Sequence, residues 1–316
     1  MTRKILKWTG SLLLILIAGV SIITATRQHV KYSAPYPAIK ASNDSSMIAR
    51  GKQIIYGPAH CVECHNAGNV DSLLLAGANI PLSGGRKFSF GLGNFYTKNI
   101  TPDVATGIGK YTDGEIARVL RYGVHADGTA VFDFMPFHNM TDEDLTAVIS
   151  YLRAQQPVYN KVPMHEPNLL GKMVIAFMVK PVGPSEPIKA SIPQDTSAAY
   201  GKYLVTNVAN CSGCHTKRSL SGAYKGELMA GGSPIAKEGF PALTPPNVTG
   251  DSSSRIFRWS QSDFVNRFHE GKKIPFSEMP WNSFKSMSDN DLKAVYNYLK
   301  SIKSAKSSED ASLVKK

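Results

Sequence analysis

The apolar and polar positions along the chain separate a hydrophobic N-terminal segment from a long region in which helical stripes alternate with polar loops. Nineteen uncharged residues, 8–26, follow a basic start and precede Arg27. A basic start followed by ~20 apolar residues is typical of a single membrane span or a secretory signal peptide. We favour a membrane anchor over residues 1–26, because no clean small-residue cleavage site follows it. Residues 27–43, with two prolines, then predict an extended tether.

The pattern after the tether occurs twice. Residues 47–56 (MIARGKQIIY) align with residues 198–205 (AAYGKYLV), and Gly51 and Gly201 each lie ten positions before a cysteine. Glycine costs a helix about 1 kcal/mol relative to alanine, so a repeated glycine predicts a close helix crossing in each half. Candidate N-caps of these two helices are Ser46 and either Thr196 or Ser197.

A middle helix follows in each half. Residues 99–103 (Asn-Ile-Thr-Pro-Asp) align with residues 247–251 (Asn-Val-Thr-Gly-Asp) at an offset of 148, and the same offset pairs Gly123 with Gly271. Apolar side chains at i, i+3 and i+4 within 116–120 predict an amphipathic helix. The two glycines are expected to end these middle helices.

A last helix closes each half. Thr141 and Ser288 each lead an acidic turn and an apolar stripe, which is a helix-start signature. The loops 66–110 and 216–258 exceed the ~12–15 residues of ordinary connections, so each half needs a bound group to complete its core. We therefore predict an all-α fold of two tandem domains behind the anchor. The predicted boundaries are 44–155 for the first domain, 156–195 for a proline-rich linker, 196–302 for the second domain and 303–316 for a basic tail.

The predicted linker contains one apolar run, 169–179. This run is too short to cross a bilayer, which takes ~20 residues. We expect it to pack as a helix between the domains, with docking against a partner as the alternative.

The four cysteines carry the chemistry. They form two Cys-x-x-Cys-His motifs, at 61–65 and 211–215, and this motif is the attachment signature of c-type haem. The two thiols form thioethers with the porphyrin, and the histidine binds the iron. A four-cysteine zinc ribbon is the alternative, but its pairs usually lie ~15–20 residues apart, whereas 146 residues separate Cys64 from Cys211. We therefore predict two covalently attached haem c groups, on Cys61, Cys64, Cys211 and Cys214, with His65 and His215 as iron ligands.

Each iron needs a second axial ligand, and methionine commonly partners histidine in cytochromes c. Met135 and Met279 occupy equivalent places between the middle and last helices, each before a proline that keeps the backbone extended. A methionine is often only core filler, but the repeated Met-Pro pair favours ligation. We predict Met135 and Met279 as ligands, with His138 and Met229 as rivals. The remaining candidates are given structural roles: Met140 and Met287 before helix caps, and His125, His165 and His269 as exposed or satisfied residues.

Composition and charge narrow the class of protein. With 42% hydrophobic and 19% charged residues, the chain is neither wholly disordered nor a multi-span membrane protein. The net charge of +12 divides into +6 over residues 1–43, zero over 44–180 and +6 over 181–316. No nucleic-acid partner is expected, because no binding motif supports a dense basic face. The basic second half either speeds docking with an acidic redox partner or only keeps the tail solvated.

Taken together, these motifs resemble class I cytochromes c, specifically the haem-bearing subunits of exported, membrane-bound sugar, alcohol and aldehyde dehydrogenases. The resemblance is close over residues 46–155 and looser over 196–302. Those subunits typically carry three haem domains and a C-terminal amphipathic anchor, and Gly250 replaces the proline of their Asn-x-Thr-Pro-Asp block. The matching segments are 61–65, 84–86, 99–103, 106–109, 111–118, 121–123 and 135–137.

The resemblance implies an electron carrier without catalytic residues, on the periplasmic side of the bacterial cytoplasmic membrane. It would pass electrons between a dehydrogenase or respiratory complex and a downstream acceptor. The implied partners are a dehydrogenase catalytic subunit, a quinol-oxidising complex or a terminal oxidase. A dihaem peroxidase or a thiosulfate-oxidising cytochrome is the alternative. Either would need an open sixth position or a cysteine ligand, and the two motifs use every cysteine.

Overall fold

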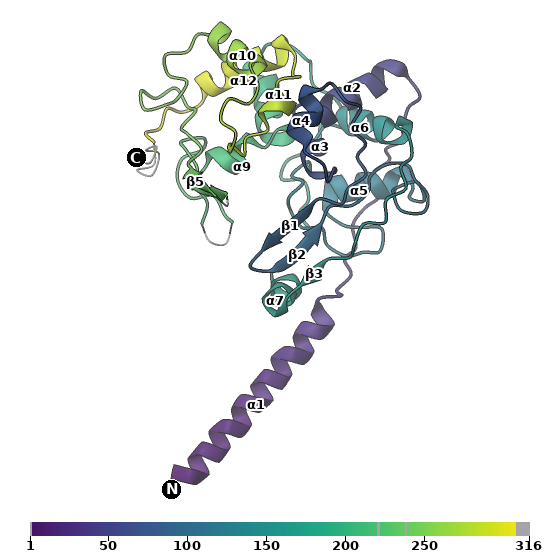
Figure 1. Ribbon diagram of the computed structural model, residues 1–316, viewed down its shortest axis with the longest axis vertical. Helices are drawn as coiled ribbons and strands as arrows, with labels where there is room; N and C mark the ends of the chain where they lie inside the picture. The colour runs from purple at the N-terminus through teal and green to yellow at the C-terminus, as the bar shows by residue number, and fades with distance from the viewer. Residues whose placement is uncertain (1, 220–221, 238, 308–316) are drawn as a thin grey trace.

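The computed structural model describes residues 2–219, 222–237 and 239–307, so most of the predicted basic tail lies outside the described residues. A long helix, α1, projects from a body of two lobes (Figure 1). The helices are α1 (Thr2–Arg27), α2 (Ser45–Tyr56), α3 (Cys61–Cys64), α4 (Val70–Leu75), α5 (Asp113–Tyr122), α6 (Asp142–Ala154), α7 (Leu169–Phe177), α8 (Ala198–Tyr203) with its π-helical continuation η1 (Leu204–Val208), α9 (Cys211–His215), α10 (Gln261–His269), α11 (Trp281–Phe284) and α12 (Asp289–Ser301).

Two small sheets accompany the helices. β1 (Lys87–Phe90), β2 (Gly93–Tyr96) and β3 (Glu166–Pro167) form an antiparallel sheet in that order, and β4 (Ile235–Lys237) pairs with β5 (Phe240–Leu243). Both hairpins lie within the long loops that the sequence left without elements. Backbone groups in such loops need partners, and the hairpins supply them. The all-α prediction is therefore too narrow for the described residues.

The order of elements recurs in the two lobes. In the first lobe α2 packs against α6, and in the second α8 packs against α12. A Cβ added to Gly51 would lie 1.9 Å from the carbonyl oxygen of Ala147, and one added to Gly201 would lie 1.9 Å from that of Ala294. The predicted close crossings are thus confirmed, because only glycine lets the helix backbones approach this far.

The helix ends follow the sequence signals with one exception. Thr141, Ser288 and Ser197 each cap a helix through the side-chain oxygen, and Gly123 ends α5 in the left-handed conformation with φ 60°. The prediction of Ser46 as a cap is wrong. The Asp44 carboxylate, two residues earlier, accepts hydrogen bonds from the N–H groups of residues 46 and 47 and begins α2.

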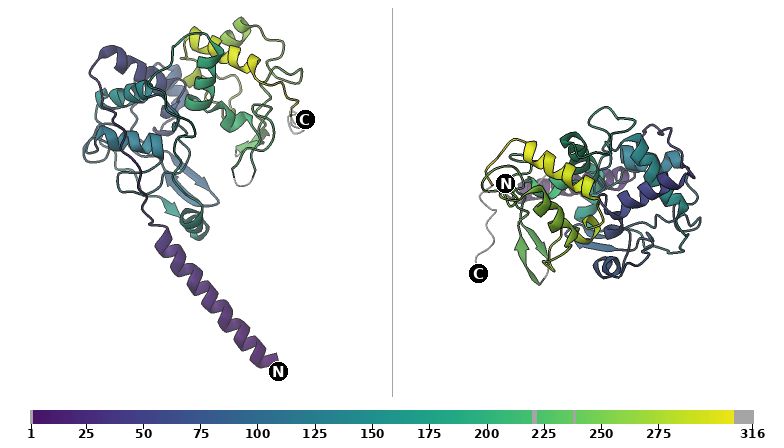
Figure 2. Two further views of the ribbon diagram at one scale, coloured as in Figure 1. Left: turned by 180° about the vertical axis from the view of Figure 1, so that it is seen from behind. Right: turned by 90° about the horizontal axis from the view of Figure 1, so that it is seen from above.

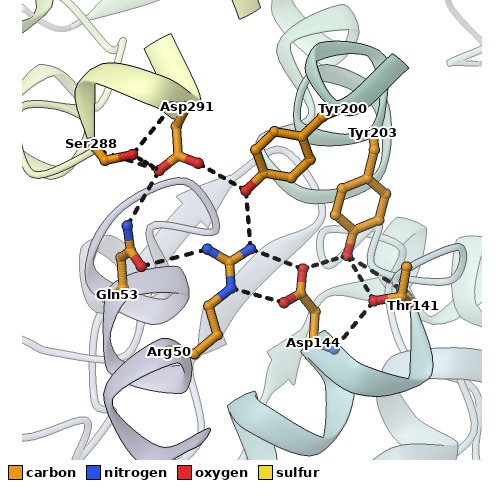
Figure 3. A network of polar contacts seen from close by, with 8 residues as sticks. All are labelled: Arg50, Gln53, Thr141, Asp144, Tyr200, Tyr203, Ser288 and Asp291. Atoms are coloured by element: carbon orange, nitrogen blue, oxygen red, sulfur yellow. Dashed lines mark hydrogen bonds and ion pairs between the residues drawn. The ribbon is translucent and has the colours of Figure 1, made fainter. Parts of the chain in front are cut away.

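A polar network joins the two lobes (Figure 3). Arg50 is paired with Asp144 at 2.9 Å within the first lobe, and it also donates to the Tyr200 hydroxyl at 3.2 Å. Tyr200 in turn donates to Asp291 at 2.8 Å, while Tyr203 donates to Asp144 at 2.7 Å. Gln53 likewise donates to Asp291 at 3.2 Å, so the aspartate of each lobe accepts a hydrogen bond from the other lobe.

The segment between α1 and the first lobe runs extended along that lobe and is bonded to it. The Arg118 guanidinium donates to the Tyr36 hydroxyl at 2.8 Å and lies 4.7 Å from its ring centroid. Further along, the backbone N–H of Ala41 donates to the Asp113 carboxylate at 2.8 Å. The contacts hold this segment against α5.

Helix α7 contains much of the apolar run 169–179, and it does not lie between the lobes as expected. It packs against α1 and β3, below the first lobe (Figures 1 and 2). Gly171 makes this packing possible, because a Cβ there would lie 2.1 Å from the carbonyl oxygen of Leu92 in the β1–β2 turn. Over Lys4–Arg27, α1 is long and apolar enough to cross a membrane, and its side chains are almost entirely exposed.

Candidate functional site

Each Cys-x-x-Cys-His motif folds into a short helix with an unusual start. His60 and Asn210, directly before the first cysteines, adopt the left-handed conformation with φ 39° and 48°. This conformation turns the chain sharply into α3 and α9. Since each helix makes about one turn, the two thiols of a motif lie on the same turn.

All eight predicted ligands line a single cavity of about 1540 Å³. This exceeds the ~300–1,000 Å³ of an ordinary small-molecule pocket, and its walls are mainly apolar. The structure therefore brings together the two sets that the sequence predicted separately. They are Cys61, Cys64, His65 and Met135 from the first lobe, and Cys211, Cys214, His215 and Met279 from the second.

The two motif histidines are oriented in the same way. Nδ1 of His65 lies 2.8 Å from the carbonyl oxygen of Lys98, and Nδ1 of His215 lies 2.8 Å from that of Pro246. A carbonyl can only accept, so Nδ1 donates and Nε2 keeps its lone pair for a metal. Burial lowers the pKa of both histidines, with the carbonyl bond acting in the opposite direction. Both rings are therefore held neutral, as ligation requires.

The repeated Asn-x-Thr segments explain how those carbonyls are positioned. Asn99 and Asn247, each next to the carbonyl that orients a histidine, are buried. Each side-chain oxygen accepts from the backbone N–H two residues later, at 3.0 and 2.8 Å. Each side-chain nitrogen donates to a distant backbone carbonyl, at 2.8 and 2.7 Å. The repeat of this motif is visible in the sequence, but its role in positioning the carbonyls is not.

Met135 and Met279 are presented by the same type of turn. The backbone N–H of Phe137 donates to the carbonyl of Met135 at 2.8 Å, and that of Trp281 donates to the carbonyl of Met279 at 2.8 Å. Both methionines are half-buried and line the cavity. The two methionines thus line the cavity from equivalent places in the two lobes.

The two rivals fit ligation less well. His138 does not line the cavity, and its Nε2 lies 2.9 Å from the carboxylate of Asp133. Met229 lines the cavity but is fully buried, and it stands where the first lobe has the fully buried Leu82. The correspondence is shown by matching bonds from the N–H groups of residues 100 and 248 to the carbonyls of Leu82 and Met229. A leucine at the equivalent position indicates a core role for Met229.

The thiols are not arranged for redox or zinc chemistry. Burial raises the pKa of Cys61 and of Cys211 to about 12, whereas reactive cysteines and zinc ligands need a lowered pKa. In the part of the chain that the structure describes, no three His, Cys, Asp or Glu side chains converge as metal ligands. Paired neutral thiols beside an oriented imidazole, at the wall of an apolar cavity, match the donor set of a c-type haem.

His60 is a residue that sequence reasoning missed. It lines the shared cavity next to Cys61, and its ring lies 5.7 Å from that of Phe284 in the second lobe, in an edge-to-face arrangement. Ala209 and Asn210, which precede the second motif, line the same cavity. The two motif helices therefore approach each other across the lobe interface, which no spacing in the sequence indicated.

Comparison with known proteins identifies the second lobe. Residues 198–303 match the protein family described as Cytochrome c. This segment is a cytochrome c domain. A cytochrome c domain implies covalently bound haem c, in agreement with the motif at 211–215.

Most of the chain has relatives among cytochrome subunits. It is 31% identical over 286 residues to the cytochrome c subunit of alcohol dehydrogenase (quinone) from Gluconobacter oxydans, covering 82% of this chain and 55% of that subunit. It is 28% identical over 300 residues to the fructose dehydrogenase cytochrome subunit of Gluconobacter japonicus, covering 90% and 57%. The chain thus spans little more than half the length of these relatives. The expected resemblance to dehydrogenase cytochrome c subunits, rather than catalytic subunits, is confirmed.

One further relative matches over nearly its full length. It is a protein of Cereibacter sphaeroides named "Diheme cytochrome c-type", 27% identical over 306 residues, covering 93% of this chain and 97% of the relative.

Proposed function

We propose that this chain is a membrane-tethered dihaem cytochrome c that carries electrons on the periplasmic side of the bacterial cytoplasmic membrane. The observation that carries the proposal is the cavity into which two equivalent Cys-x-x-Cys-His motifs and two Met-Pro turns project. The similarity to a relative named as dihaem, over nearly all of its length, supports the count of two.

In this proposal each lobe is one cytochrome c domain, 44–155 and 196–302, with the anchor at 1–26 and the tether at 27–43. A bound haem supplies an iron that takes up and releases one electron. Cys61 and Cys64 would hold the first group and Cys211 and Cys214 the second. The backbone carbonyls behind His65 and His215 keep Nε2 of each histidine directed at the cavity.

Met135 and Met279 would occupy the remaining axial position in each site. Filling that position excludes substrate from the metal, which is the property that separates an electron carrier from a peroxidase. The surrounding apolar wall keeps water out and favours a stable ligand set. The chain's own residues would thus attach the haems, orient the iron ligands and keep substrate and water away from the iron.

The donor or acceptor we propose is a dehydrogenase catalytic subunit, because the similar proteins are named as subunits of dehydrogenases. A quinol-oxidising complex or a terminal oxidase would be the second redox partner, at the opposite end of the electron transfer. The uneven charge, neutral over residues 44–180 and basic over 181–316, is suited to two different docking faces.

The count of two is tested by intact mass and a pyridine haemochrome assay on the full-length protein. We expect two haem c groups in the wild type, and one in each of the double variants Cys61→Ser/Cys64→Ser and Cys211→Ser/Cys214→Ser. Loss of colour from only one double variant, with the other unchanged, would show that a single motif is used and would overturn the dihaem proposal.

The axial assignment is tested by the near-infrared sulfur-to-iron band of the oxidised protein. Met135→Ala and Met279→Ala are each expected to remove about half of its intensity, because each would remove one of two thioether ligands. Met229→Leu is the matched control, since the equivalent position of the first lobe is a leucine, and it should leave the band intact. A band unchanged in both alanine variants would contradict the assignment.

A further inference from the structure

Helix α7 presents an apolar face that the protein leaves uncovered. Leu169 is 73% exposed, Leu170 56% and Met178, just after the helix, 62%. The two leucines begin this helix of nine residues, and Met178 directly follows it. Several large exposed apolar side chains on one short element indicate a surface that is covered by something else.

The position of α7 indicates what covers it. The helix packs against α1, and Arg27 at the end of α1 donates from Nε to the carbonyl of Ala176 at 3.2 Å. The same guanidinium lies 5.7 Å from the ring centroid of Phe177. Thr24, one turn earlier, is buried, whereas its neighbours in α1 are exposed. The contact therefore involves the last turns of the candidate membrane span.

This contact fixes the depth of α7 relative to the span. The apolar segment of α1 continues to Thr26, and from Thr24 to Arg27 the helix axis advances only about 4.5 Å. With Arg27 at the headgroups, a helix that touches both residues lies at the boundary between headgroups and acyl chains. Interfacial helices bury their apolar face ~5–10 Å into this boundary.

The charges around α7 suit a lipid surface. Residues 167–185 contain no Asp or Glu, and Lys172 and Lys180 are exposed. The nearest acid in the sequence, Glu166 of β3, accepts a hydrogen bond from Asn94 at 2.9 Å. Lysine stems can lie along apolar surface while their ammonium groups reach anionic headgroups. A docking site for an acidic protein would need a broader basic surface than these two lysines provide.

We propose that α7 is a second membrane contact, a short apolar helix that lies in the periplasmic interface of an anionic phospholipid bilayer beside the end of α1. This inference rests on the proposed anchoring role of α1. Gln28 and Ile175 belong to the wall of the large cavity, so that wall would extend to this membrane contact.

The test uses the full-length holoprotein in vesicles of phosphatidylethanolamine and phosphatidylglycerol that carry a photoactivatable acyl chain. Labelled peptides are located by mass spectrometry. We expect lipid adducts in α1 and in residues 169–178, and about tenfold fewer over residues 253–258. The reference segment contains Phe257, which is 43% exposed, close to the 42% of Phe177, but belongs to the second lobe.

The variant Leu170→Glu/Phe177→Glu should lose the adducts in α7 and keep those in α1, while Phe257→Glu should change neither. Unaltered haem content and absorption spectrum would show that each variant has folded. Adducts in α1 without any in α7 would overturn this inference and leave the anchor intact. Absence of adducts from both helices would instead overturn the anchor. Protection of α7 by a co-purified protein in place of lipid would also overturn the inference that α7 contacts the membrane.

Discussion

The half-buried histidine His165 gives this protein a dependence on acid pH. Partial burial lowers the pKa of His165 to about 4, and the nearby Lys98 and His125 act in the same direction. Its Nδ1 accepts a hydrogen bond from the backbone N–H of Tyr96 at 3.1 Å, which a protonated ring cannot do. The folded protein therefore holds His165 neutral where an unfolded chain, with a histidine pKa near ~6.5, binds a proton.

The sign of the resulting pH dependence follows directly. Stability from neutral His165 is fully present above about pH 6.5 and is lost as the pH falls toward 4, because the unfolded state binds more protons in that window. We expect His165→Gln to reduce the pH slope of the unfolding free energy there by up to about one proton. Urea unfolding between pH 4 and 7 measures it. His29→Gln, which replaces an exposed histidine, is the control. An unchanged slope in His165→Gln would contradict the assignment of this pH dependence to His165.

Single residues also show which part of the site could be predicted from sequence. The cysteines and motif histidines were recognisable because covalent attachment fixes their spacing. The role of Asn99 could not be read in the same way, since its partner carbonyl lies 59 residues away. The cap at Asp44 was missed because an aspartate and a serine are both good caps and only the backbone decides between them.

At the scale of elements, the two glycine crossings make a sharp prediction. Gly201→Ala would place a methyl group 1.9 Å from the carbonyl of Ala294, so α8 and α12 must separate. We expect a loss of about 1–3 kcal/mol in unfolding free energy, the usual cost of overpacking. Gly114→Ala is the matched control: it also lies in a helix, but the nearest atom to its added Cβ is 3.5 Å away.

Denaturant unfolding of the two variants compares them directly. Gly114→Ala should be neutral or slightly stabilising, because alanine favours a helix. Equal stability of both variants would mean that α8 and α12 do not cross as closely as described.

The elements themselves were predictable to different degrees. The helices carry periodic apolar stripes and caps, and α5, α6 and α12 lie where those signals placed them. The hairpins are only three to four residues per strand, too short for an alternating pattern to stand out. The location of α7 depends on contacts with α1 and the β1–β2 turn, which no local pattern reveals.

For the whole molecule, the lobe interface is the feature most open to test. The side chains of Arg50 and Asp144 are 11% and 3% exposed, so removing one leaves a buried charge unpaired. We expect Arg50→Met to lower the unfolding free energy by about 3–5 kcal/mol. Lys52→Ala, an exposed cation in the same helix, should change it little. Similar denaturation midpoints for both variants would contradict the role of the network.

The attachment of the extended segment to the first lobe has a consequence for how the protein meets its partners. A flexible linker would let the two lobes take many orientations relative to α1. Here the bonds made by Tyr36 and Ala41 join that segment to α5, so the first lobe follows the orientation of α1. With α1 in the bilayer as proposed, the protein meets membrane-bound partners by lateral diffusion in two dimensions. Only a partner whose redox centre lies at a matching height above the membrane can then exchange electrons with it.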